Sequence, residues 1–291
     1  MNTWPRQQVC EVADGIVTIV HGHGEVGVAN ASFIVEGKRA MVIDTMTFPE
    51  MAAGIVHEIA RRGAHVDAVL NTHHHIDHVG GNTLFADVPI VAHPASVQAL
   101  QQLGLPAARY DRLMPQFRGR FDTLALSMPA SRLDQLVPPH GGMVRAFTAA
   151  HTPADLAVWF PTSRVLIAGD LCFIGVTPLA VNGLISGWIA ALDALIALQP
   201  AVVVPGHGPI GTGEDLRVLQ DYFLAIQCIG RAAVTQNQSS QDALALLDTG
   251  PLAEWIEPER HLINLERAMQ EAAGEIHQMN LSAMPPSTRQ P

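Results

Sequence analysis

The sequence predicts an α/β fold in which mixed β-sheets are covered by helices. The main reason is that short apolar, β-branched runs alternate with segments of helical periodicity in both halves of the chain. Composition is the second reason, because a chain of 291 residues with 48% hydrophobic and 15% charged residues can bury a large core. We therefore expect one domain over residues 1–291.

The first half of the chain is predicted to begin with strands separated by turns. Gly22-His23-Gly24 and Gly37-Lys38 interrupt the apolar runs, as turn residues do. A helix is expected to follow the third strand. In chain order the elements are strands 16–20, 31–35 and 40–43, helix 49–62, a strand around Ala68 and strand 89–92.

The same pattern resumes after residue 142 and ends in helices. Residues 94–142 are predicted to form a helical, partly irregular insertion over the functional site, because a structureless loop of this length is improbable inside a compact domain. A C-terminal helical extension is expected at 229–284 and a frayed tail at 285–291. The other elements are a strand from Val144, strands 157–160 and 165–168, helix 189–198, strand 201–204, and helices around 214–229, 241–247 and 258–277.

The most informative segment is Thr72-His73-His74-His75-Ile76-Asp77-His78, which has HxHxDH spacing. Neutral imidazole and carboxylate groups are ligands of zinc and similar divalent ions. A strand-like run precedes this segment and Gly80-Gly81 follows it. The histidines are therefore expected on a strand-to-helix loop, where proteins usually present functional groups.

The spacing predicts two groups of metal ligands on this loop. His73 and His75 can point to one ion while Asp77 and His78 turn to a second, and His74 is expected to face away. A histidine-rich surface loop without function is the alternative. The interleaved acid and the flanking strand argue against that alternative.

Four more acidic or histidine positions follow apolar runs elsewhere in the chain. With the HxHxDH segment they form five motifs in an order that resembles the metallo-β-lactamase superfamily of metallohydrolases, over about residues 14–228. The resemblance implies a four-layer αββα sandwich with ligands on loops at one edge of the sheets. The four positions are Asp44 after run 40–43, His151 after 144–149, Asp170 after 165–168 and His207 after 202–204.

This resemblance implies a dinuclear metal centre. Two zinc ions are the implied cofactor, with iron or manganese as alternatives, and the pair would share a bridging hydroxide that attacks a carbonyl at neutral pH. Asp77 is a candidate proton acceptor as well as a ligand. Asp44 and Asp155 are expected to accept a hydrogen bond from a bound imidazole, with turn capping as the alternative for Asp155. The implied ligands are His73, His75 and His151 for one ion, Asp77, His78 and His207 for the other, and Asp170 as the bridge.

The carboxylate at the bridging position narrows the expected function. It resembles glyoxalase II, lactonases and related branches rather than β-lactamases, which carry cysteine or serine there. We therefore expect an enzyme that hydrolyses a small ester, thioester or lactone with an apolar group. Three alternatives stay open: a persulfide dioxygenase with one iron, β-lactam hydrolysis as a minor activity, and a non-catalytic metal-binding protein.

The substrate pocket is expected to be apolar. Residues 171–192 carry no charge, and proline, asparagine and glycine interrupt them, so we expect a buried wall or active-site loop rather than a membrane span. For the basic cluster in the insertion, a solvated surface is favoured over binding of an acidic substrate. This cluster comprises Arg109, Arg112, Arg118 and Arg120. The candidates for substrate contact are His23, Tyr110, Phe173 and Trp188, and for His23 a position on an exposed, glycine-flanked loop is the favoured alternative.

Charge and cysteine content limit the expected partners and location. A formal net charge of -10 with Lys38 as the only lysine argues against a nucleic-acid partner. Three scattered cysteines and the lack of an apolar run near Met1 lead us to expect the cytoplasm. A small-molecule substrate is expected, without membrane association, and a homodimer stays open.

Overall fold

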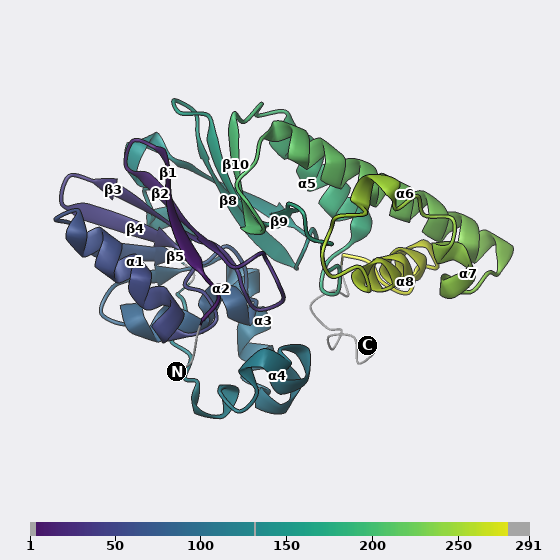
Figure 1. Cartoon of the computed structure of the whole chain (residues 1–291), viewed down its shortest axis with the longest axis horizontal. Coiled ribbons are helices and arrows are strands. Elements are labelled where there is room, and N and C mark those ends of the chain that lie inside the picture. Colours follow the sequence, from purple (N-terminus) through teal and green to yellow (C-terminus); the bar gives the residue numbers. More distant parts are fainter. Residues whose placement is uncertain (1–3, 131, 279–291) are drawn as a thin grey trace.

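The computed structural model describes residues 4–130 and 132–278. It contains two β-sheets that face each other between outer layers of helices (Figure 1). One sheet has the strand order β1-β2-β3-β4-β5-β6, and the other has the order β10-β9-β8-β7. This arrangement confirms the predicted αββα sandwich.

The first sheet is antiparallel from β1 to β4 and parallel from β4 to β6. The change of direction follows from helix α1 (Pro49–Arg61), since a parallel pair needs a crossover connection. Asp44 follows the end of β4, and the HxHxDH segment follows the end of β5. The strands are β1 (Gln7–Ala13), β2 (Ile16–His21), β3 (Ala31–Glu36), β4 (Arg39–Ile43), β5 (His65–Leu70) and β6 (Ile90–Val91).

The second sheet is antiparallel from β7 to β9, and β9 pairs with β10 in parallel. Helix α5 (Ile185–Ile196) provides the crossover between β9 and β10. Strands β8 and β9 are buried along their whole length, as expected for strands covered on both faces. The strands are β7 (Met143–Thr148), β8 (Ala154–Phe160), β9 (Val165–Phe173) and β10 (Val202–His207).

The two sheets are held together by a buried apolar cluster between them. Ile16, Ile34 and Ile43 of the first sheet belong to the same cluster as Phe160 and Ile167 of the second. Two further clusters fill the spaces between each sheet and its outer helices. Because both sheets are buried on the inner face, their strand ends are fixed relative to each other, and loops from both can build one site.

The remaining elements surround the sandwich. Helix α6 packs against both α5 and α8 on the outer side of the second sheet (Figure 1). No helix in the described ranges is both long and apolar enough to cross a membrane. The elements are α2 (Ile76–Val79), η1 (Gly80–Phe85), α3 (Pro94–Leu103), α4 (Ala107–Leu113), η2 (Pro115–Phe117), η3 (Phe121–Thr123), η4 (Leu133–Gln135), η5 (Pro139–Gly141), α6 (Gly213–Gln236), α7 (Ser240–Leu244), η6 (Gly250–Leu252) and α8 (Arg260–Ala272).

Most expected elements are present, with two differences of substance. Strand β1 was not predicted, because this edge strand is rich in polar and exposed residues and lacks an apolar run. Strand β9 continues to Phe173, past the end at residue 168 that was predicted, and its pairing with β10 shifts register over this extension. Residues 94–142 contain helices and 3-10 turns, as expected. The expected tail at 285–291 lies outside the described residues.

Phe160 tests the importance of the cluster between the sheets. Its side chain is 1% exposed, so Phe160→Ala should lower the free energy of unfolding by about 3–5 kcal/mol through lost burial and a residual cavity. Urea denaturation measures this change. Val137→Ala is the control, because Val137 is 85% exposed and should change stability by less than about 0.5 kcal/mol. Equal losses for the two variants would contradict the inferred role of the cluster.

Candidate metal centre

The predicted ligand residues meet where loops of the two sheets converge. His73, His75, Asp77 and His78 come from the connection that follows β5 and from α2. The second sheet provides the other three. These are His151 from the loop between β7 and β8, Asp170 from within β9, and His207 at the end of β10.

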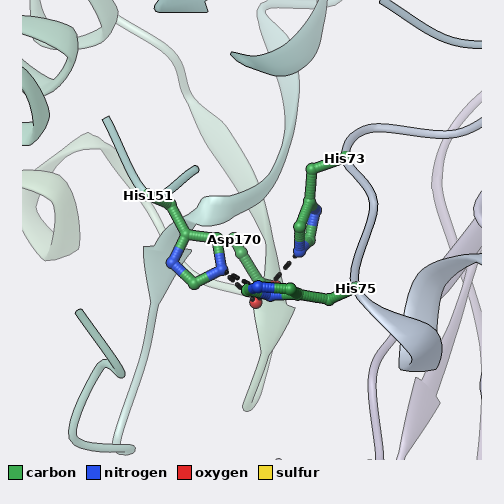
Figure 2. Close-up of side chains that lie close together, drawn as sticks. All are labelled: His73, His75, His151 and Asp170. Atoms are coloured by element: carbon green, nitrogen blue, oxygen red, sulfur yellow. Dashed lines mark hydrogen bonds and ion pairs between the residues drawn. The ribbon is translucent and has the colours of Figure 1, made fainter. Parts of the chain in front are cut away.

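The first group of side chains surrounds a carboxylate oxygen (Figure 2). His73, His75, His151 and Asp170 each offer one ligand atom, and these atoms all lie within 4.8 Å of one another. Nε2 of His73 lies 3.7 Å and Nε2 of His151 lies 3.2 Å from Oδ2 of Asp170. Nδ1 of His75 lies 3.0 Å from Nε2 of His151. Three imidazoles therefore present nitrogen atoms to one point.

The second group lies on the other side of Asp170. Asp77, His78 and His207 also offer ligand atoms within 4.8 Å of one another. Nε2 of His207 lies 3.3 Å from Oδ2 of Asp77 and 3.6 Å from Oδ2 of Asp170. Nε2 of His78 lies 3.0 Å from Oδ1 of Asp170. The Asp170 carboxylate therefore faces both groups, as the bridging position requires.

Unsatisfied buried atoms show that this arrangement fits a metal. Nε2 of His73 is buried and has no hydrogen-bond partner among the described residues, and Nε2 of His78 and Oδ1 of Asp170 have none besides their mutual contact at 3.0 Å. Such atoms are rare in proteins, because each loses its hydration without compensation. Nitrogen and carboxylate oxygen donors in sets of three or four suit zinc, and imidazole also suits iron.

The electrostatics differ between the ligand histidines: burial by itself lowers the pKa of His78, but Asp170 and Asp44 outweigh it and raise this pKa well above its usual value, so a metal would have to displace a proton there. Burial lowers the pKa of His73 far below its usual value and that of His75 to about 4, so both are neutral and able to bind a cation. Burial by itself raises the pKa of Asp77 and of Asp170. The neighbouring His78 and His207 outweigh this effect and hold the pKa of both carboxyls below the usual range. Both carboxylates are therefore ionised.

Asp44 orients two parts of the HxHxDH segment, as expected. Its Oδ2 lies 2.7 Å from Nδ1 of His78 and accepts a hydrogen bond from Oγ1 of Thr72, and its Oδ1 accepts one from the Thr72 backbone N–H. Oγ1 of Thr72 in turn lies 3.1 Å from Nδ1 of His73. The positive φ of Asp44, 61°, is uncommon outside glycine, and these hydrogen bonds offset its strain.

Two further ligand histidines are oriented by segments distant in sequence. Nδ1 of His207 lies 3.1 Å from the carbonyl oxygen of Gly24. Nε2 of His75 lies 3.0 Å from Oδ1 of Asn182, which leaves Nδ1 to face the centre. Sequence reasoning missed Asn182. The signal was an amide side chain inside the uncharged, mostly apolar segment 171–192.

Asp155 does not contact a ligand imidazole, contrary to the first expectation for it. Its carboxylate accepts hydrogen bonds from the backbone N–H and from Oγ1 of Thr152. Asp155 therefore braces the loop that carries His151, which is the turn-capping alternative. Nδ1 of His151 is buried without a hydrogen-bond partner among the described residues, and its ring packs at 4.9 Å against Trp188.

A cavity of about 500 Å³ opens over the centre. Five of the ligand residues form its polar floor: His75, Asp77, His151, Asp170 and His207. The insertion and the segment after β9 supply most of the other walls. These residues include Ala99, Leu103, Pro106, Tyr110, Leu113 and Met114 from the insertion, and Phe173, Leu179, Val181 and Asn182 from the second sheet and its connection to α5.

Two of the four residues expected to contact substrate lie at the cavity. Tyr110 and Phe173 line the cavity, and the Phe173 ring stacks on His207 at 5.1 Å. His23 is exposed and does not line the cavity, although the carbonyl of its neighbour Gly24 contacts His207. Trp188 is fully buried behind the wall, where its Nε1 donates to the carbonyl oxygen of Leu171.

His74 and the basic cluster also differ from expectation. His74 belongs to neither ligand group, but it is buried and lines the cavity instead of facing away. Arg109 lines the cavity, whereas Arg112 and Arg118 are exposed. Arg120 covers the Trp4 ring at 4.1 Å and lies 3.3 Å from Glu50. The cluster is therefore mostly a surface feature, with one member at the site.

Helix α8 holds the segment that forms one wall of the cavity. Asn264 donates to the carbonyl oxygen of Pro178 and accepts from the N–H of Ala180. Three other residues of α8 lie on the same face of the helix as Asn264, because each is three or four residues from the next, and they bind the same segment. Arg260 donates to the Thr177 carbonyl, Arg267 donates to the Gly183 carbonyl, and Glu271 accepts from the N–H groups of Ile185 and Ser186.

Comparisons with known proteins agree with this geometry. The family model of the metallo-beta-lactamase superfamily matches residues 24–207, which is more than half of the chain. The chain belongs to the metallo-beta-lactamase superfamily. Among solved structures of the superfamily fold, TMB-1 has a TM-score of 0.60 at 20% identity, covering 75% of this chain and 96% of that chain. The metallo-beta-lactamase FIM-1 from Pseudomonas aeruginosa has a TM-score of 0.59 at 14% identity, covering 76% and 96%.

Curated superfamily relatives are more similar in sequence but match a shorter region. A hydroxyacylglutathione hydrolase of Synechococcus sp. strain JA-3-3Ab is 30% identical over 173 residues, which are 58% of either chain. The same enzyme of strain JA-2-3B'a(2-13) is 29% identical over 167 residues, covering 57% of this chain and 56% of the relative. The chain therefore spans less than two thirds of the length of these relatives.

Substitution of His73 tests the ligand set. His73→Ala should reduce the zinc bound per chain after reconstitution and gel filtration, because it removes one nitrogen from the first group. Elemental analysis by mass spectrometry measures the loss. His74→Ala is the matched control, since it changes the neighbouring histidine and should keep the metal content of the unaltered protein. Full metal content in a folded His73→Ala variant would exclude His73 as a ligand.

Asn182 should affect metal affinity without touching the metal. Removing the acceptor that orients His75 should weaken zinc binding of Asn182→Ala by about 10-fold or more. Competition with a chromophoric chelator measures this affinity. Asn182→Asp keeps an acceptor in place and should stay closer to the unaltered protein. If both variants bind zinc with unchanged affinity, the contact with His75 has no orienting role.

Proposed function

We propose that this protein is a metal-dependent hydrolase of a small ester, thioester or lactone that carries an apolar group. One observation carries the proposal: two complete ligand groups share Asp170 on the floor of a mainly apolar cavity. The names of the curated relatives, which are hydroxyacylglutathione hydrolases, support hydrolysis as the reaction class. We propose two zinc ions as the cofactor.

When bound, such ions lower the pKa of water and polarise a carbonyl group, so no serine or cysteine nucleophile is needed. In four of the ligand histidines, the ring nitrogen that faces away from the centre lies within hydrogen-bond distance of a partner, and Asp155 braces the loop that carries the fifth, His151. The ligand groups are therefore preorganised. The four histidines are His73, His75, His78 and His207. Asp77 is partly exposed in the cavity and ionised, and its carboxylate is our candidate acceptor for the proton of the attacking water. Phe173, stacked on His207, offers an apolar face beside the reacting bond.

The proposed reaction consumes one water molecule. For a thioester, the water oxygen bonds to the acyl carbon and the carbon–sulfur bond breaks. The electron pair leaves with sulfur, one proton of the water ends on the thiol, and the other is released from the acid product. A covalent thiol route is not supported, because Cys172 is fully buried, is outside the cavity lining, and its burial raises the pKa of the thiol.

Metal removal and Asp170 together test this proposal. Chelator treatment should abolish hydrolysis of a panel of phenylacetyl thioesters, phenyl esters and aryl lactones, and zinc should restore it. Asp170→Asn should lower kcat/KM by on the order of 100-fold, because the bridging charge is lost. His57→Ala on the exposed face of α1 is the control and should keep full activity.

The same preparation distinguishes the proposal from its main alternative. Elemental analysis should give about two zinc ions per chain if the dinuclear hydrolase is correct. A single iron, with oxygen consumption on persulfide substrates and no hydrolysis, would overturn the proposal in favour of a dioxygenase. Hydrolysis that survives complete metal removal would also overturn it.

A further inference from the structure

Two arginines line the cavity, and only one of their guanidinium groups has a hydrogen-bond or ion-pair partner among the described residues. Arg260 of α8 donates to the carbonyl oxygen of Thr177, and its Nη2 lies 3.5 Å from Oε2 of Glu257. The guanidinium of Arg109 in α4 contacts neither a carbonyl oxygen nor a carboxylate of the described residues. Among the described residues, no carboxylate lies within the 4.0 Å of an ion pair with its guanidinium, and no side-chain hydrogen bond is formed by it.

The position of Arg109 makes an unpaired charge costly. Its side chain is about half buried, and the surrounding residues of the insertion at the cavity are mostly apolar, including Leu103 and Leu113. Burial lowers the pKa of Arg109, but a guanidinium stays charged at neutral pH. A partly desolvated cation gains free energy when an anion of matching geometry reaches it.

Helix α4 contains a second arginine, Arg112, whose position differs from that of Arg109. Arg112 lies three residues further along, is exposed, and does not line the cavity. Tyr110 and Leu113, like Arg109, line the cavity. The face of α4 that covers the cavity is therefore apolar apart from the phenol of Tyr110 and the guanidinium of Arg109. A ligand that fills this space meets the floor residues and Arg109 in the same cavity.

We propose that Arg109 selects substrates that carry a carboxylate in addition to the bond that is hydrolysed. The planar guanidinium matches a carboxylate with two parallel hydrogen bonds, which a neutral amide of the same shape cannot form equally well. This inference rests on the proposed hydrolase function and adds a substrate class to it. The substrate would then have an apolar body between its anionic group and the reacting carbonyl.

Paired thioesters test this proposal in the metal-loaded protein. One pair carries a carboxylate or its carboxamide on the acyl side, and the other pair carries them on the thiol side. For each pair, the measured quantity is the ratio of kcat/KM for the anionic member to that for the neutral member. We expect at least one ratio to be about tenfold or more, and Arg109→Gln should bring that ratio close to one.

Two variants control for general damage to the insertion. Arg112→Gln removes a charge from the same helix outside the cavity and should keep the ratio of the unaltered protein. Arg109→Lys keeps the charge without the planar fork and should keep part of the preference. Ratios near one for both pairs in the unaltered protein would overturn the proposal. An Arg109→Gln variant that keeps the ratio would overturn it as well.

A binding measurement separates this inference from the proposed function. Non-hydrolysable thioethers matched to the same pairs can be titrated by calorimetry, without any turnover. Tighter binding of an anionic thioether that is lost in Arg109→Gln and kept in Arg112→Gln would support the role of Arg109 even if no thioester is hydrolysed. Hydrolysis without any anion preference in binding or turnover would leave the hydrolase and exclude the role of Arg109.

Discussion

The arrangement of the whole site depends on the ionised carboxylate of Asp170 in the protein interior. Burying such a charge costs several kcal/mol unless opposite charges or donors surround it. His78, His151 and His207 lie close to its oxygens, and Oδ1 has no partner among the described residues besides Nε2 of His78. A cation on either side of Asp170 satisfies this requirement. Because the surrounding ligands come from both sheets, metal binding would also contribute free energy to the packing of one sheet on the other.

Local strand and helix patterns were sufficient to predict most of the sandwich, whereas the candidate ligands, which the structure brings together, were implied by the resemblance to a known superfamily. Each ligand follows or lies within an apolar strand, and strand ends at one edge of a sheet lie close together. Contacts between distant segments were not predictable in this way. Asn182 and His75 are 107 positions apart, and nothing in either segment alone specifies the other. Strand β1 was missed for a related reason, since an edge strand is defined by its neighbour β2 more than by its own residues.

The wrong expectations concern the direction of side chains. His23 was a candidate for substrate contact because the resemblance places its loop near the metals, but its side chain is exposed, whereas its neighbour Gly24 contacts His207. Trp188 was placed on the wall because it is large and apolar, yet on α5 its side chain points into the core against Phe223 at 4.5 Å. Spacing along the chain predicts which residues share an element. It does not predict which of them the tertiary packing turns toward a cavity.

The polar face of α8 lies outside residues 24–207, which match the family model, but it holds segment 177–186, which belongs to that region. This segment supplies Leu179, Val181 and Asn182 to the cavity wall, and Asn182 also contacts the candidate ligand His75. A change in the sequence of α8 therefore affects both the shape of one wall and the orientation of one imidazole. In evolutionary terms, substitutions in a helix that carries no candidate ligand can alter the fit of a ligand and the affinity for a metal together.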